Sequence, residues 1–258
     1  MTSFEALQIS QKILATMLIL QSWEFLRLRP TFDDHGIWRL NELKEDYSRL
    51  PSFIRQILIY IFRPNHFVAL LLIRLLAAIA LLFWSSPYLL LFLFASTLLI
   101  GIRWRGVFNG GSDYMTLILL MALSAATLLR NYRLVVLGAF YYVTVHFVAS
   151  YFVAGLVKVL RPNWRSGKAL KEFLQSPIYY CPTWLQSLCK NKSMTILMSW
   201  SVMLFELTFP LCLLGGPYAA VFIGLSFAFH LSNFYFLGLN RFVWSWAACY
   251  PIIWFVSN

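Results

Sequence analysis

The chain has 258 residues, of which 60% are hydrophobic and only 12% are charged, and its formal net charge is +11. A soluble domain carries about a quarter charged residues, so this composition excludes an ordinary globular protein and indicates an integral membrane protein. The positive charge does not indicate a nucleic-acid partner, because no basic run belongs to a soluble module. It fits loops that face anionic headgroups, and membrane lipids are therefore expected partners.

Apolar segments long enough to cross a bilayer recur along the chain and predict an all-α fold. No internal repeat or long linker divides them, so we expect a single domain over 1–258, built as a polytopic membrane helical bundle. An amphipathic stretch, 50–62, is expected to lie at the membrane surface. Either Ser112 or Asp113 is expected to cap the fourth helix. The eight expected spanning helices are 7–26, 67–84, 87–102, 114–129, 134–160, 194–214, 218–239 and 242–256.

Basic residues gather in the loops on one face of such an eight-span bundle. That face holds the loop 27–63, Arg103, Arg105, the segment 161–192 and Arg241, whereas Lys12, Arg130 and Arg133 lie on the other. Since positive loops stay inside, the first face is expected in the cytoplasm and both termini outside.

Four cysteines occur in the second half of the chain. Cys212 and Cys249 lie in apolar helices and are expected to be packing residues. Cys181 and Cys189 flank an irregular segment, 177–192, and would form a disulfide only if that segment faced an oxidising compartment. They have no histidine partners at zinc spacing, so no metal site is expected.

Ionisable side chains within apolar helices are costly in lipid, and they usually face the bundle interior, a partner or a water-filled cavity. We expect Arg74 to pair with a carboxylate, with Glu206 as the first choice. Glu24 and Lys158 lie near helix ends, so each could instead extend its polar group to the headgroups. The six residues of this kind are Glu24, Arg74, His146, Lys158, Glu206 and His230.

The two helical histidines, His146 and His230, have a simple interpretation as hydrogen-bonded core residues. Asn233 weakens this interpretation for His230, because three residues further along the helix it lies on the same face. Two neighbouring buried polar side chains need a shared partner or a cavity.

The expected helix 134–160 carries the most informative pattern. Tyr151, Ala154 and Lys158 lie along one face, and Gly155 beside them allows the close approach of a helix or a ligand. A lysine shielded from water loses its proton more easily than an exposed one, so Lys158 could act as a base.

This pattern resembles a family signature. The segment Tyr151 to Lys158, followed by Trp164, Gly167 and Ala169, resembles the vitamin K-dependent gamma-carboxylase-like transmembrane family, also called the HTTM domain. Weaker agreement extends in order along nearly the whole chain. It includes the turn 33–36, Asn109-Gly110-Gly111-Ser112-Asp113, Glu206 to Pro210, Phe229 to Asn233, and Phe242.

The resemblance implies chemistry on a reduced isoprenoid quinone, of vitamin K or menaquinone type. In the carboxylase, a lysine matching Lys158 deprotonates vitamin K hydroquinone, and oxygen then yields a strong base that takes a proton from a peptide glutamate. The resulting carbanion captures carbon dioxide. Lys158 is therefore the expected catalytic residue. The expected substrate-binding residues are Tyr151, His146, His230, Asn233, Glu206 and Trp164.

Several functions stay open under this resemblance. The carboxylase's long soluble C-terminal region has no counterpart here, so its carboxylation substrate is not implied. The short bacterial type resembles sporulation-delaying protein B, which implies maturation of a peptide at a bacterial inner (plasma) membrane. The alternative is a non-catalytic subunit or chaperone that binds a partner membrane protein. A transporter is disfavoured, because inverted repeats and broken helices are not evident. The carboxylase's lysine faces the lumen, whereas the charge pattern places Lys158 inside.

Overall fold

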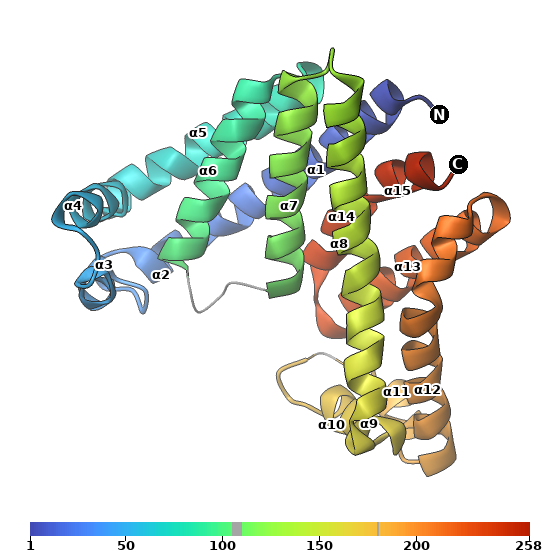
Figure 1. Cartoon of the computed structure of the whole chain (residues 1–258). Coiled ribbons are helices and arrows are strands. Elements are labelled where there is room, and N and C mark those ends of the chain that lie inside the picture. The colour runs from blue at the N-terminus through green and yellow to red at the C-terminus, as the bar shows by residue number, and fades with distance from the viewer. Residues whose placement is uncertain (105–109, 180) are drawn as a thin grey trace. The chain divides into compact units, whose positions relative to one another are not determined.

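A computed structural model describes residues 1–104, 110–179 and 181–258. Helices joined by turns make up these ranges, and no strand occurs within them, which confirms the all-α fold (Figure 1). The chain divides into two compact units. We call Leu7–Val136 the N-terminal unit, and Leu137–Asn258 together with Met1–Ala6 the C-terminal unit. The single domain expected over 1–258 stays a prediction.

Within the described ranges, five helical segments are long and apolar enough to cross a membrane. They are Pro64–Phe83, Gly111–Leu128, Arg133–Leu160, Lys192–Leu214 and Gly216–Leu237. The expected count of eight is not confirmed. The expected eighth span is instead two helices of 8 residues each, α14 (Asn240–Ala247) and α15 (Tyr250–Ser257), each only about 12 Å long.

The N-terminal unit packs three long helices in sequence, since α5 contacts α6 and α6 contacts α7. Pro64 and Pro87 open α5 and α6, where a missing backbone N–H costs nothing and the fixed φ suits the helix. An aromatic core lies at one end, with Phe25 stacked on Trp104 at 4.9 Å between ring centroids. The helices are α1 (Ser3–Arg27, mostly in this unit), α2 (Arg29–Phe32), α3 (Leu40–Leu43), η1 (Lys44–Tyr47), α4 (Ser52–Ile61), α5 (Pro64–Phe83), α6 (Pro87–Arg103) and α7 (Gly110–Leu128).

Arg74 is fully buried in this unit, where its guanidinium donates hydrogen bonds to neutral side chains of α1 and α6. The acceptors are Ser22 Oγ at 2.8 Å, Gln21 Oε1 at 2.7 Å and Thr97 Oγ1 at 3.2 Å. The expectation that Glu206 would neutralise Arg74 is wrong, because both Glu206 oxygens accept hydrogen bonds from Lys158.

The expected cap of the fourth spanning helix is also wrong. Helix α7 begins at Gly110, so Ser112 and Asp113 lie inside its first turn rather than before it. Two residues used in the sequence analysis, Arg105 and Asn109, lie outside the described residues.

The C-terminal unit surrounds α13 with shorter elements, since η2, α14 and α15 all contact it. Helix α12 gives way to the 3₁₀ turn η2 at Phe209 because Pro210 has no N–H for the carbonyl of Glu206. The helices are α8 (Arg133–Leu160, in this unit from Leu137), α9 (Pro162–Arg165), α10 (Lys168–Leu174), α11 (Thr183–Leu188), α12 (Lys192–Thr208), η2 (Phe209–Leu214), α13 (Gly216–Leu237), α14 and α15.

Cys181 and Cys189 are free thiols that form a small core with Leu174 and Leu185. Burial raises the pKa of both thiols, and the neighbouring Cys189 raises that of Cys181 further. Since both thiols are free, no disulfide joins them in this structure. Cys212 and Cys249 are also free and fully buried, as expected of packing residues.

Candidate functional site

Lys158 and Glu206 form an ion pair near the end of α8. Lys158 Nζ donates to both carboxylate oxygens of Glu206, at 2.5 and 2.6 Å. The side chain of Glu206 is 4% exposed and that of Lys158 is 19% exposed. A carboxylate this deeply buried needs its partner, because an uncompensated charge in an apolar interior is strongly destabilising.

Gly155 lets α8 and α12 approach closely enough to make this pair. A Cβ added at Gly155 would lie 2.9 Å from Glu206 Cβ and 2.9 Å from the backbone nitrogen of Leu207. Of the two roles expected for Gly155, the structure shows the close helix approach. Lys158 lies three residues further along α8, so this contact brings the ammonium group alongside Glu206.

The segment after α8 folds back and places an indole ring beside the ion pair. Lys158 Nζ lies 5.3 Å from the ring centroid of Trp164, a cation–π distance. Ser199 of α12 donates a hydrogen bond to the Trp164 carbonyl at 2.6 Å, which fixes the backbone of α9. Gly167 has a left-handed φ of 75° and packs against Thr195 and Ile196, where a side chain would be strained.

A cavity of about 290 Å³ adjoins Lys158. Lys158 and Asn233 supply its polar groups, and the rest of its wall is aromatic or aliphatic. Its position beside the ion pair brings a base or a cation within reach of whatever binds there. The lining residues are Lys158, Trp164, Leu170, Phe173, Leu174, Val202, Phe229, Asn233, Phe236, Leu237 and Leu239.

A second polar group of side chains joins α8, α13 and α15. The Tyr151 hydroxyl lies 2.6 Å from both Ser226 Oγ and His230 Nε2, and Ser226 Oγ lies 2.8 Å from the Tyr250 hydroxyl. Tyr151 also stacks on Phe209 at 4.0 Å between ring centroids. Within the described ranges, His230 Nδ1 is buried without a hydrogen-bond partner.

The structure brings most of the expected site residues together and separates one. Lys158, Trp164 and Asn233 line the cavity, and Glu206 lies behind Lys158. Tyr151 and His230 belong to the hydroxyl network.

His146 is separate from both groups. Its Nδ1 bonds the Tyr142 carbonyl at 2.9 Å, and it lies about 18 Å from Lys158 along the helix axis. His146 is only partly buried, so it is not the core histidine of the simple interpretation, and it does not line the cavity beside Lys158.

Ser226 and Tyr250 are members of the network that sequence reasoning missed. Ser226 precedes His230 by four residues and so lies on the same face of α13, which is a signal that the helical spacing contains. Tyr250 has no such signal, because only packing brings α15 against α13.

The arrangement at Lys158 suits proton transfer rather than metal binding. Within the described ranges, no three His, Cys, Asp or Glu side chains lie close enough to hold a metal ion. Lys158 lies at the wall of a largely apolar cavity, and Glu206, with which it can exchange one proton, lies behind it. Such a pair can accept a proton from a bound hydroxyl without bulk solvent.

Comparisons with known proteins identify the family. No curated protein and no solved structure matches the chain significantly, so the finer resemblance to sporulation-delaying protein B is not confirmed. The family model of the HTTM domain matches residues 122–257. That range contains the Lys158 signature, Glu206 and His230, whereas the turn 33–36 and residues 109–113 lie outside it. Because the match covers more than half of the chain, this protein belongs to the HTTM domain family of integral membrane proteins.

Proposed function

We propose that this protein is a membrane enzyme that binds a reduced isoprenoid quinone beside Lys158 and uses Lys158 as the base. The observation that supports this most is that Lys158, paired with Glu206, lines an apolar, aromatic cavity. A purely structural ion pair would not need a cavity beside it. The quinone would be of vitamin K or menaquinone type.

The cavity residues fit the ring of a quinone. Small-molecule sites enclose about 300–1,000 Å³, and the 290 Å³ here suits a ring headgroup whose tail extends elsewhere. Phe173, Phe229 and Phe236 offer aromatic surface for stacking. The Asn233 amide can hydrogen-bond one ring oxygen while Lys158 meets the other. When bound, a reduced quinone supplies a weakly acidic hydroxyl and reducing power toward oxygen.

Lys158 must be neutral to accept the hydroxyl proton, and Glu206 can make it neutral by taking the proton of its ammonium group. In an apolar setting a lysine–carboxylate pair can pass its proton to the carboxylate, which leaves an amine and a carboxylic acid. The amine nitrogen then takes the hydroxyl proton and becomes an ammonium group. Glu206 is by then a neutral carboxylic acid whose carbonyl oxygen can still accept a hydrogen bond from that ammonium group, and the positive charge is balanced by the deprotonated quinol.

The proposal for the substrate that is modified rests on the family resemblance alone. A peptide or a lipid-borne group would receive the chemistry, and a lyase-type carboxylation or another step of peptide maturation belongs to this proposal. A bacterial inner membrane is the expected setting.

The test uses the full chain purified in mild detergent. Mass spectrometry of the extract would identify bound quinone, and oxidation of added reduced menaquinone by oxygen would be followed by absorbance. Lys158→Arg keeps the positive charge but cannot release its proton, so quinone should still bind while turnover falls at least about 100-fold. Lys168→Arg is the matched control, because Lys168 is exposed and pairs with Glu172 at the surface.

The second candidate is a non-catalytic binding platform for a partner membrane protein. The observation in its favour is that Lys158 engages both oxygens of Glu206, as a structural pair does. Full turnover by Lys158→Arg at normal expression, or the absence of quinone from the purified protein, would favour this platform and reject the enzyme.

A further inference from the structure

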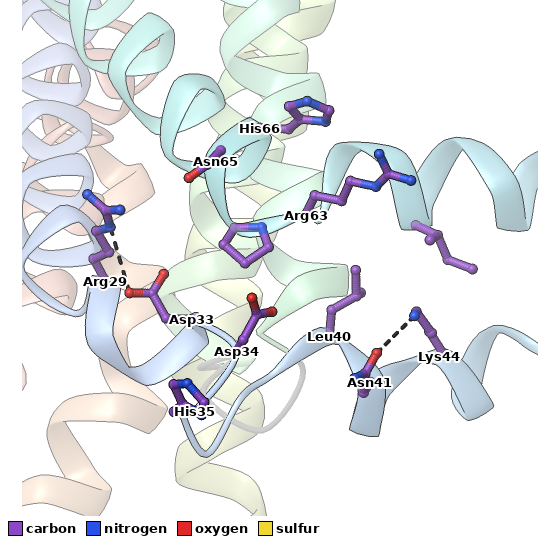
Figure 2. A pocket seen from close by; sticks show the side chains of 12 residues that line it. Arg29, Asp33, Asp34, His35, Leu40, Asn41, Lys44, Arg63, Asn65 and His66 are labelled. Atoms are coloured by element: carbon purple, nitrogen blue, oxygen red, sulfur yellow. Dashed lines mark hydrogen bonds and ion pairs between the residues drawn. The ribbon is translucent and has the colours of Figure 1, made fainter.

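The N-terminal unit contains a larger cavity, of about 700 Å³, which is lined mainly by charged and polar side chains (Figure 2). Its walls come from the turn after α2, from the segment 40–44, from the end of α4 and from the first turn of α5. This composition is the opposite of the apolar cavity at Lys158 and points to a charged ligand.

Opposite charges lie on different sides of this cavity. In Figure 2 the carboxylates of Asp33 and Asp34 lie toward one side, and the cationic ends of Arg63 and Lys44 lie toward the other. Asp33 is already within 3.8 Å of Arg29. Among the described residues, the Asp34 carboxylate has neither an ion pair nor a hydrogen bond. The cavity therefore offers one carboxylate and two cations to a ligand.

Hydrogen bonds to the backbone of residues 31–38 hold the turn that carries Asp34. The Trp38 amide donates to the Thr31 carbonyl at 2.7 Å, and a Cβ added at Gly36 would lie 2.2 Å from that carbonyl oxygen. The buried Arg103 donates to the Phe32 carbonyl at 3.3 Å. These contacts fix the backbone on both sides of Asp34, so its carboxylate is presented from a rigid turn.

The helices beside this cavity place it at the depth of lipid headgroups. Helix α5 is an apolar segment long enough to span a membrane, and Arg63, Pro64 and His66 lie at its first turn, where the apolar stretch begins. Helix α4 exposes an apolar face, with Phe53 at 72% and Tyr60 at 59% exposure. Such a face suits a helix lying in the membrane interface.

We propose that this cavity binds the phosphoethanolamine headgroup of a membrane phospholipid. Arg63 presents a planar fork of donors that matches a phosphate, and Lys44 adds a second positive charge on that side. Asp34 faces the primary ammonium group, which can donate hydrogen bonds to a carboxylate. A phosphocholine group has no such donors and is better held by aromatic rings. A purely anionic headgroup would meet the carboxylates with nothing to offset them.

The test counts lipids retained by the full chain. Delipidated protein in mild detergent would be incubated with phosphatidylethanolamine, phosphatidylcholine or phosphatidylglycerol of the same acyl chains, and bound lipid would be measured by native mass spectrometry. The parent protein should retain phosphatidylethanolamine about tenfold better than phosphatidylcholine. Asp34→Asn should lower phosphatidylethanolamine retention about tenfold and raise that of phosphatidylglycerol, whereas Arg63→Gln should weaken both.

Two control variants outside the cavity make the same changes in charge as Asp34→Asn and Arg63→Gln. Glu45→Gln and Arg49→Gln alter exposed residues of the same loop region and should retain lipid as the parent does. Equal retention by Asp34→Asn and Glu45→Gln would overturn the proposal. So would equal retention of phosphatidylethanolamine and phosphatidylcholine by the parent. Displacement of the lipid by millimolar inorganic phosphate would also overturn it, since the site would then serve a soluble phosphate compound.

Discussion

A basic side chain in each unit, Arg74 and Lys158, makes hydrogen bonds with side chains of other helices, and the two have different partners. Arg74 in the N-terminal unit is fully buried and donates to Ser22, Gln21 and Thr97, which are neutral. Lys158 in the C-terminal unit donates to the carboxylate of Glu206 and borders a cavity.

Under the proposed function, the difference is between a structural cation and a reactive one. An arginine cannot give up its proton in a protein, so a set of neutral oxygens can fix it permanently. A lysine beside a carboxylate can exchange its proton with that carboxylate, and the adjoining cavity can hold a ligand whose hydroxyl proton the neutral amine accepts. Chemistry is therefore expected at Lys158 and helix packing at Arg74.

The largest effect on stability is expected from Glu206→Leu. Removing the carboxylate leaves the ammonium group of Lys158 unpaired, and breaking a buried pair in this way costs about 3–5 kcal/mol in free energy of unfolding. Unfolding in mixed detergent micelles would measure the loss. Glu172→Leu is the matched control, since Glu172 pairs with Lys168 at 3.8 Å while both are more than 60% exposed, and it should cost under about 1 kcal/mol. Equal losses would mean that the Lys158 pair is no more buried than a surface pair.

Arg74→Leu is expected to cost less, at about 1–3 kcal/mol. Ser22 and Thr97 keep their own hydrogen bonds to the Leu18 and Leu93 carbonyls, so of these three acceptors it is Gln21 Oε1 that loses its partner. The same unfolding measurement applies. A loss as large as that of Glu206→Leu would contradict the distinction drawn between the two cations.

Gly155→Ala tests the close approach that makes the Lys158 pair possible. The added methyl group would meet Glu206 Cβ and backbone at 2.9 Å, so the helices must separate at a cost of about 1–3 kcal/mol. Gly138→Ala on the same helix meets nothing within 4 Å and should stabilise α8 by about 0.5–1 kcal/mol. If both variants shift stability in the same direction, the approach at Gly155 is not tight.

The smallest effect concerns Cys181 and Cys189, two buried acids outside the spanning helices. Burial raises their pKa in the folded state, so both stay protonated at pH 8 and should react slowly with iodoacetamide compared with the unfolded chain. Since the unfolded thiols ionise near pH 8.5 and the folded ones only above it, stability should be unaffected below that pH and fall as the pH rises further. Rapid labelling of the folded protein at pH 8 would show that this small core opens readily.

The sequence determined the membrane character, the all-α class and the ends of several helices, because these depend on local composition. Helix α8 was expected at 134–160 and runs from Arg133 to Leu160. Apolar runs of this length can satisfy their backbone hydrogen bonds in lipid only as helices, and Pro87 marks a helix start whatever the tertiary context. Helix α5 begins at Pro64, three residues before the expected start at 67. Charge within such runs also singled out Arg74, Lys158 and Glu206.

Only the tertiary structure decided which of these residues meet. The pairing of Glu206 with Lys158 rather than Arg74 depends on the close approach at Gly155. Ser226 and Tyr250 join Tyr151 and His230 only because α15 packs on α13. A helix repeats its pattern every 3.6 residues, so a sequence shows which residues share a face, but the rotation of each face toward its neighbours is fixed by packing.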